Sequence, residues 1–502
     1  LDGRYNRIIY NDAAASLFDA VSGTVKNLRI DGTGNVSGGV AARLESGAVI
    51  DNCRVMSTAV LNGADIGGIV GSVRMTGYKV YTITNCTIED GASINGTGIY
   101  VGGIIGSVTG DPLGRVKIEN CEVGRAKITG KGAGADSDGE TTAAVGGLGG
   151  ILGYGAASIV DCSSAAILEA TGNAGYGIGG IVGALGTTQG TLNLNKVGFT
   201  GSITVNGEAG SIGGILGLRP NNTPYPTIGG PTVSINNAYS TGSIRVGSVR
   251  QGSHIGGILG NNFDRSDNSV EISNTYWNGS YTNASGSLDG FGAISGNSAG
   301  VTAANTYYRS GFDSTAGTAK DADFFASGEA AYELDNNGGN QRGTWTQGED
   351  GPIFNRDGED GIIYKVEVEG ETDVEWPDGT KAKLTTTVTS ERNKGLGIPP
   401  SDKAFVKKGE KIITEVTGIP DPKVVKNSDG STTTTNYEVK IKDRGGDQLL
   451  YDSTNPMMDV SISKDLSTKA TSEVSTKTTG KDSGQGGGSG GGSGSGNQPG
   501  QG

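Results

Sequence analysis

The sequence GGIVG at residues 67–71 decides the fold, because it recurs along the chain. Close copies read GGIIG, GGILG, GGIVG, GGILG and GGILG, and they start at Gly102, Gly149, Gly179, Gly213 and Gly256. Weaker copies, GGVAA and GAISG, start at Gly38 and Gly292. The start-to-start spacings run from 29 to 47 residues, and self-similarity at a period of about 20 to 50 residues is typical of stacked repeats. The sequence therefore predicts a solenoid.

A second motif lies between the glycine motifs and reads VIDNC, TITNC, KIENC and SIVDC. The Ile and the Cys lie three residues apart, so strand alternation breaks between them and the chain must bend. Asn tolerates the left-handed backbone of such a bend, and stacked amides can bond to one another. We therefore expect a structural asparagine column, which includes Asp161 at one position and is interrupted by Lys196. Its members are Asn27, Asn52, Asn85, Asn120, Asn237, Asn274 and Asn305.

Each repeat offers three short strand candidates, such as IGGIVGSV, KVYTITNC and ASING within residues 66–96. Runs of Val, Ile and Thr cut by Gly and Asn fit strands, and no convincing 3.6-residue period is present. The prediction is an all-β fold whose residues 1–310 form a parallel β-helix of about nine coils. The paired glycines would permit positive φ and close backbone approach. A phosphate-binding loop is disfavoured, because it needs a following helix.

Three segments follow the repeats. Residues 311–361 contain DADFFASGEAAYELDNNGG, a short helix candidate, and we expect this module to cover the open end of the solenoid. Residues 362–466 alternate with a period of two and predict a small immunoglobulin-like β-sandwich, with Trp376 and Tyr437 in its core. Residues 467–502 are rich in Ser, Thr and Gly and predict a disordered linker.

The composition restricts the classes of partner. Fifty-three acidic against 40 basic residues give a net charge of −13, which argues against nucleic acid or anionic lipid. No apolar run approaches the roughly 20 residues that cross a bilayer, so we expect no membrane insertion. The chain starts at Leu1 without a signal peptide, and we expect a monomeric fragment of a larger, exported surface chain.

The glycine motif and the intervening I-x-N-C frame resemble the GLUG repeat of bacterial surface proteins, over roughly residues 17–354. The resemblance implies an extracellular or cell-surface repeat region without assigned catalytic residues. GLUG repeats also occur beside immunoglobulin A-cleaving metallopeptidases, which use an HExxH zinc site. This chain contains one histidine, His254, so no such peptidase domain is present.

The cysteines share one repeat position. A stacked column of small buried side chains is the favoured interpretation, and the later replacements Val197, Ala238, Thr275 and Thr306 support it. Adjacent coils would also place two such residues within disulfide range, so some pairing stays open. A metal site is the least favoured, because no CxxC pair exists. The column consists of Cys53, Cys86, Cys121 and Cys162.

Tyr239, Tyr276 and Tyr307 share the next position, which earlier coils fill with Arg54, Thr87, Glu122 and Ser163 and which therefore faces outward. Stacked there, the three rings would form an exposed strip suited to a sugar or a protein. The alternative is that they pack under a loop or the capping module.

Two acidic loops are weak calcium candidates, one with Asp136, Asp138 and Glu140 and the other with Asp264 and Asp267. Neither matches a full calcium motif, and solvated insertions are the simpler explanation. No nucleophilic triad can be built around one histidine, so no catalytic residue and no cofactor is predicted. A glycosidase-type carboxylate pair stays open, because separation in space is invisible in a sequence.

These observations favour a non-catalytic, adhesin-like protein of the bacterial cell surface. Its solenoid would act as a spacer and as a lateral binding surface for a glycan or a host protein. The alternative is a polysaccharide-degrading enzyme, a lyase or glycosidase, on a β-helix scaffold, by analogy of fold alone.

Overall fold

The computed structural model describes residues 1–130, 147–171, 177–185, 191–218, 232–260, 270–284, 286, 290–337, 339–445, 448–456 and 458–479. The chain divides into two compact units, Leu1–Ile363 and Tyr364–Gly502. Each unit has its own hydrophobic core, and each is described by itself.

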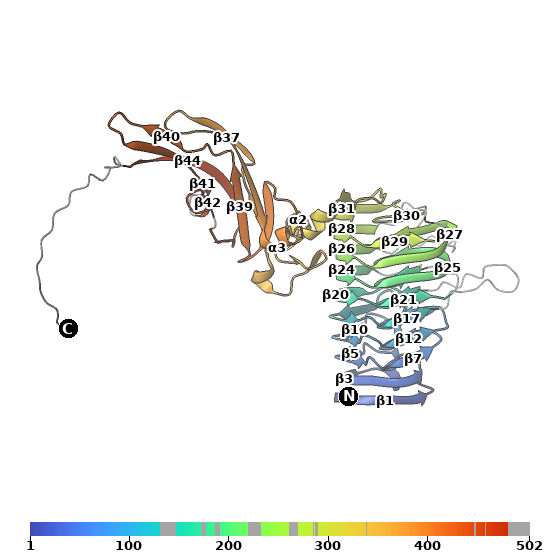
Figure 1. Ribbon diagram of the computed structural model, residues 1–502. Helices are drawn as coiled ribbons and strands as arrows, with labels where there is room; N and C mark the ends of the chain where they lie inside the picture. Colours follow the sequence, from blue (N-terminus) through green and yellow to red (C-terminus); the bar gives the residue numbers. More distant parts are fainter. Residues whose placement is uncertain are drawn as a thin grey trace, which may run out of the picture. The chain divides into compact units, whose positions relative to one another are not determined.

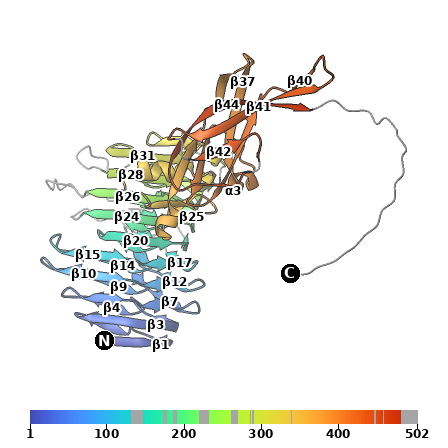
Figure 2. The ribbon, with the colours of Figure 1, turned by 90° about the vertical axis from the view of Figure 1, so that its left-hand side faces the viewer.

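The first unit is a parallel β-solenoid, which confirms the predicted fold class. Its strands lie as stacked rungs from β1 to β31 (Figures 1 and 2), and the pairings between described coils are parallel. One face consists of β1 (Asp2–Ala13), β3 (Thr24–Asn35), β5 (Val49–Asp51), β10 (Val80–Thr84), β15 (Arg115–Glu119), β20 (Ser158–Ser164), β24 (Leu192–Phe199), β26 (Val233–Ser240), β28 (Val270–Trp277), β31 (Val301–Arg309) and β32 (Thr318–Lys320).

Beyond the asparagine bend the coil continues through short strands and then along a second face. The short strands are β6 (Arg54–Val55), β11 (Thr87–Ile88) and β16 (Glu122–Val123). The second face consists of β7 (Val60–Gly63), β12 (Ser93–Gly96), β17 (Lys127–Gly130), β21 (Ile167–Ala170), β25 (Ser202–Gly213), β27 (Ser243–Gly256) and β29 (Ser280–Asn283).

The glycine motif is split between two further sets of strands. Its first glycines end β8 (Ile66–Gly67), β13 (Tyr100–Gly102), β18 (Gly147–Gly149), β22 (Gly177–Gly179) and β30 (Phe291–Gly292). A separate six-stranded parallel sheet then follows, made of β2 (Phe18–Val21), β4 (Ala41–Leu44), β9 (Val70–Met75), β14 (Ile105–Gly110), β19 (Leu152–Tyr154) and β23 (Val182–Ala184). Two of the three expected strands are therefore broken in two, one at the glycine pair and one at the asparagine.

The glycine motif is a site of close backbone approach. A Cβ on Gly68 would lie 2.3 Å from the carbonyl oxygen of Gly103, and a Cβ on Gly103 would lie 2.0 Å from that of Gly150. None of the motif glycines that the structure describes is among the residues with positive φ. Of the two expected reasons for glycine here, close approach is confirmed and positive φ is wrong.

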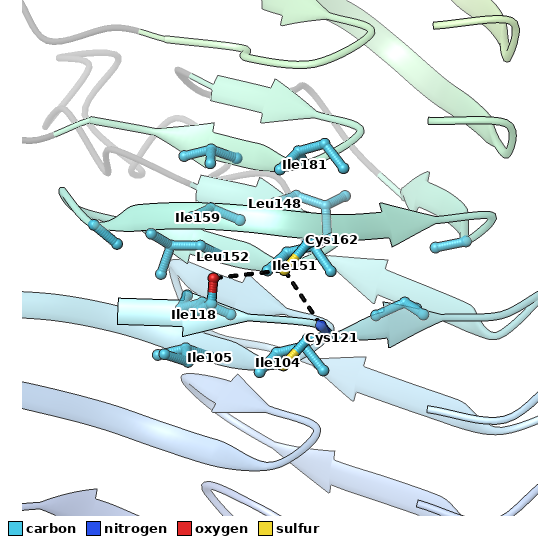
Figure 3. Close-up of a cluster of buried hydrophobic side chains, with 14 of the residues drawn as sticks. Ile104, Ile105, Ile118, Cys121, Leu148, Ile151, Leu152, Ile159, Cys162 and Ile181 are labelled. Atoms are coloured by element: carbon cyan, nitrogen blue, oxygen red, sulfur yellow. Dashed lines mark hydrogen bonds between the residues drawn. The ribbon is translucent and has the colours of Figure 1, made fainter. Parts of the chain in front are cut away.

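The core is a narrow column of aliphatic side chains. Both apolar residues of the motif, Ile69 and Val70, have no solvent exposure. Strand alternation does not hold here, because the chain bends at Gly68 and Ile69 between β8 and β9. Figure 3 shows the stacked rows formed by Ile104, Ile151 and Ile181 and by Cys121 and Cys162. The interior thus repeats closely from coil to coil, whereas the outer side chains differ more widely.

The end of the solenoid is covered by the chain that follows β31. Phe312 packs on Trp277 and Phe291, with ring centroids 4.7 and 5.5 Å apart, and Ala293 N donates to Asp313 O. The rest of the capping module lies on the flank of the last coils, where α2 is beside β28 and β31 (Figure 1). Its elements are α1 (Ala322–Ala326), α2 (Glu329–Asn336), β33 (Trp345–Gln347), β34 (Pro352–Phe354) and the 3₁₀ helix Gly358–Gly361.

The second unit is a small β-module of two sheets. One sheet has the order β38-β35-β44-β41-β40, with β42 beside β41, and the other has the order β36-β37-β39-β43. Trp376 and Tyr437 lie in the core as predicted, with ring centroids 5.5 Å apart. The elements are β35 (Ile363–Glu367), β36 (Glu371–Glu375), β37 (Lys381–Ser390), α3 (Glu391–Gly395), β38 (Lys403–Lys407), β39 (Lys411–Thr417), β40 (Lys423–Lys426), β41 (Thr432–Asp443), β42 (Leu449–Asp452), β43 (Val460–Ser461) and β44 (Leu466–Thr479).

The predicted start of the linker at residue 467 is wrong. β44 pairs antiparallel with β41 from Asp443↔Thr468 to Thr432↔Thr479, and Thr and Val, which fit strands, alternate with charged residues in this segment. Residues 480–502 lie outside the described part of the chain. Among the described residues, no helix combines the length and apolar character that a membrane crossing requires.

Candidate functional site

The predicted tyrosine column exists, but the capping module covers it. Tyr239, Tyr276 and Tyr307 are partners in neighbouring strands, and the first two rings stack at 5.7 Å. Tyr276 is only 1% exposed and Tyr307 9%. Tyr239 is half-buried. The expected exposed strip is therefore wrong for Tyr276 and Tyr307, and the packing alternative holds for these two.

Aromatic side chains of the module enclose the column. Trp345 lies 6.2 Å from the Tyr239 ring and 5.9 Å from the Tyr276 ring, measured between centroids. Phe324 packs on Tyr307 at 5.0 Å, and the Tyr276 hydroxyl donates to Pro352 O. Burial raises the pKa of Tyr276 well above its usual range and that of Tyr307 to about 12. The three rings are in contact with the module, and Tyr276 and Tyr307 are covered by it.

The asparagine column has the predicted backbone conformation. Among the described residues, its nine positions from Asn27 to Asn305, with Asp161 and Lys196, have φ between 47° and 58°. The amides bond across coils: Asn52 Nδ2 donates to Asn27 Oδ1 at 2.7 Å, and Asn305 Nδ2 donates to Asn274 Oδ1 at 2.8 Å. Other members use the residue before the bend as acceptor, as Asn85 does with Asp51 Oδ1 at 2.8 Å.

In the last coils the same asparagines also bind the capping module. Asn237 Oδ1 accepts from Asn340 Nδ2 at 2.6 Å and from Trp345 Nε1 at 3.3 Å. Asn305 Nδ2 donates to the carbonyl oxygens of Glu333 and Leu334, both of which lie in α2. This second role was not predicted, because the spacing of the asparagines is the same in coils with and without the module.

The cysteine column is structural. All four cysteines are buried free thiols, so the alternative of disulfides is not realised. Each thiol donates to the carbonyl oxygen two residues earlier, as Cys86 Sγ does to Thr84 O at 3.2 Å. Thr275 and Thr306 make the same bond through their hydroxyls, at 2.7 and 2.9 Å, which explains why Thr can replace Cys. Burial raises the pKa of Cys86 and Cys162, whereas hydrogen bonds with the next thiol of the column lower the pKa of Cys53 and Cys121. All four side chains are at most 1% exposed, so reagents in solvent do not reach the thiols.

The weak calcium candidates Asp136, Asp138 and Glu140, and also Asp264 and Asp267, lie outside the described residues. Within the described part of the chain, no three His, Cys, Asp or Glu side chains are grouped as a potential metal site. The outward carboxylates Glu89 and Glu169 instead pair across coils with Arg54 and Lys127, at 3.2 and 2.9 Å.

A candidate that the sequence analysis missed lies where β9 and β14 turn into the next face. Turn 111–114 stacks on turn 76–79, because Asp111 N donates to Met75 O and Arg115 N donates to Lys79 O. Tyr78 at the tip is 82% exposed. We call these side chains the turn patch, and its members are Tyr78, Lys79, Val80, Leu113, Arg115 and Lys117. The signal in the sequence was weak, since YKV and LGRVK look like ordinary connections.

Comparison with known proteins gives one distant similarity. A part of halomucin, from Haloquadratum walsbyi (strain DSM 16790 / HBSQ001), is 28% identical over 187 residues, which are 37% of this chain and 2% of halomucin. The chain thus spans a very small part of that protein's length. No protein-family model matches the chain, and no solved structure matches it. The likeness to GLUG repeats therefore stays a resemblance between motifs.

Proposed function

We propose that this chain is a non-catalytic part of an extracellular, adhesin-like surface protein. The solenoid acts as a spacer and offers its lateral faces to a glycan or to a protein of another cell. The observation that carries this proposal is that the interior of the solenoid repeats from coil to coil, whereas its outer surface varies. Layers of buried Ile, Val, Leu and Cys repeat from coil to coil, whereas the position after the asparagine holds Arg54, Thr87, Glu122 and Ser163 in turn.

The distant similarity supports a location outside the cell, because halomucin is a surface protein. A rod whose interior is filled by its own side chains has no internal space for a substrate, so recognition falls to the outer faces and to the turns. No specific observation favours the polysaccharide-degrading enzyme.

The proposal is tested by probing arrays of glycans and of host surface proteins with the full chain. Specific retention of one ligand class, with the ligand recovered unchanged, is the expected result. Absence of any specific ligand would contradict a binding role. Release of shortened or unsaturated sugars from a retained polysaccharide would favour the enzyme instead.

A further inference from the structure

The turn patch combines exposed cations with an exposed ring on neighbouring coils. Val80 and Arg115 are direct partners across the parallel ladder, and so are Thr82 and Lys117. Their neighbours Tyr81, Ile83, Val116 and Ile118 are buried, so alternation turns these four side chains outward on one flat face. Adjacent strands are about 4.8 Å apart, which keeps the patch compact.

Among the described residues, the cations of the patch are not neutralised by ion pairs, although Glu119 follows Lys117 on the same face of β15. In the part of the chain that the structure describes, Lys79, Arg115 and Lys117 take part in no ion pair, and Arg74 beside the turn takes part in none either. The nearest acid in the turns, Asp111, accepts from Leu113 N within its own turn at 2.9 Å. By contrast, Arg43 one coil earlier is paired with Asp19 and Glu45.

The apolar members complete the surface. Tyr78, Leu113 and Val80 are 82%, 49% and 42% exposed, which is unusual for side chains of this size grouped on two adjacent turns. A tyrosine at a turn tip offers a flat apolar face and a polar end. A ligand for this surface therefore needs negative charge and flat apolar surface in one chain.

We infer that the turn patch is a binding site for an anionic polysaccharide, one whose sugars carry carboxylate or sulfate groups. This inference rests on the proposed function and assigns its site and its ligand class. Lys79, Arg115 and Lys117 pair with the acidic groups, and the Tyr78 ring stacks on the apolar face of a sugar.

The charge of the whole chain selects this class over other anions. A net charge of −13 repels nucleic acid and anionic bilayers, which present dense charge over an area larger than the patch. A single polysaccharide chain can bind at the patch while its other charges stay in solvent. Salt then screens the repulsion between those charges and the protein beyond about one Debye length. A neutral glycan would leave the three cations without partners.

The test uses the full chain and four defined probes: polygalacturonate, dextran sulfate, unmodified dextran and single-stranded DNA. Binding of one or both acidic polysaccharides, with an affinity that falls as NaCl rises from about 50 to about 300 mM, is expected. Carboxylate and sulfate are distinguished by which of the two polymers binds more tightly. Dextran should not bind.

Two triple variants locate the site. Lys79→Glu with Arg115→Glu and Lys117→Glu is expected to weaken binding by at least about tenfold, since three attractions become repulsions. The control variant replaces three exposed arginines elsewhere on the solenoid by glutamate, so both triple variants have the same net charge. These arginines are Arg125, Arg245 and Arg309. The control should keep its affinity within about twofold.

A third comparison tests the ring. Tyr78→Ala is expected to lose roughly threefold to tenfold in affinity, whereas Tyr78→Phe should retain it. Because all these side chains are exposed, thermal unfolding should be unchanged.

Several outcomes would overturn the inference. Equal losses in the two triple variants would show a response to net charge only. DNA binding as tight as that of the polysaccharides, through the same residues, would make the ligand class wrong. If the wild type and the patch variant retain the same array ligand, the assignment of the binding site to the turn patch is wrong, while the proposed function stands. If the wild type binds nothing at all, both fail.

Discussion

At the scale of single residues, Gly103 shows how the coil spacing is fixed. A Cβ there would lie 2.0 Å from Gly150 O and 2.9 Å from Val123 Cγ2, so Gly103→Ala must push neighbouring coils apart. Such overpacking costs about 1–3 kcal/mol or more of the free energy of unfolding. Gly23→Ala is the matched control, because nothing lies within 4 Å of its Cβ position, and it should stay within about 0.5 kcal/mol. Urea unfolding followed by circular dichroism measures both, and coincident midpoints would contradict this account.

Asn85 illustrates the other repeated residue. Its φ is 54°, and its amide donates to Asp51 Oδ1 at 2.8 Å. Asn85→Gly removes one partly solvated hydrogen bond, worth about 0.5–1.5 kcal/mol, but it also removes the steric strain of the left-handed backbone conformation. Asn85→Val loses the same bond and adds left-handed strain of about 1–2 kcal/mol. We expect the valine variant to melt at the lower temperature. An equal loss in both would mean that the side-chain bond, and not the conformation, fixes the residue.

The sequence could reveal these residues because their physical demands repeat in every coil. The asparagine position is visible as a break in alternation, and the cysteine position as a small side chain next to it. For Tyr276 the sequence left exposure and packing both open and could not decide between them, since its partners Phe325 and Trp345 lie in a segment without repeats. The four aromatic residues at Phe324, Phe325, Trp345 and Phe354 were nevertheless a usable signal, because so many rings in a short module need a surface to cover.

At the scale of elements, the capping module contains a buried carboxylate that makes its stability depend on pH. Asp335 in α2 is 4% exposed and accepts from Gly343 N and Trp345 N, both at 2.8 Å. Burial raises its pKa from 3.8 to about 6, against the opposing effect of those bonds and of Arg342. The folded chain therefore holds a proton that the unfolded chain has released between these values.

The sign of the effect follows from this shift. Protonated Asp335 contributes about 3 kcal/mol to the free energy of unfolding. This contribution is fully present below about pH 4 and is lost as the pH rises through about 6. We expect this part of the pH dependence to vanish in Asp335→Asn, although that variant should be less stable overall, because its amide turns a donor toward a backbone N–H. Melting temperatures of both proteins from pH 4 to 7 provide the check. Parallel curves would show that Asp335 does not titrate in this range.

The attachment of the module to the solenoid depends on Trp345. This side chain is fully buried, contacts Tyr239, Tyr276 and Phe354, and donates to Asn237 Oδ1. Trp345→Ala should remove about 3–5 kcal/mol and should expose the tyrosine column to solvent. Hydrogen exchange would then rise in β33, β34 and α2 first. Unchanged protection in those elements would contradict a docking role for this ring.

The module also shows where prediction at this scale fails. Composition indicated a short helix and a cover for an open sheet edge, and the turn from Phe312 to Ala316 does meet the terminal coil. The position of α1 and α2 on the flank follows instead from contacts with the last coils, such as Phe325 of α1 on Tyr276 and the α2 carbonyls on Asn305. Similarly, the Ser/Thr-rich composition of residues 467–479 suggested a linker. That prediction failed because β44 is specified by pairing with its partner β41 rather than by apolar residues.

At the scale of the whole molecule, the two units have separate hydrophobic cores, and this sets how the chain unfolds. The first core extends from Tyr10 to Ala316 and the second from Val366 to Leu466. We expect two calorimetric transitions. Trp376 is 1% exposed, packs on Tyr437 and donates to Glu438 O, so Trp376→Ala should lower one transition by several degrees, for a loss of about 3–5 kcal/mol. Gly103→Ala should shift the other transition. If either substitution moved both transitions together, the units would fold as one cooperative body.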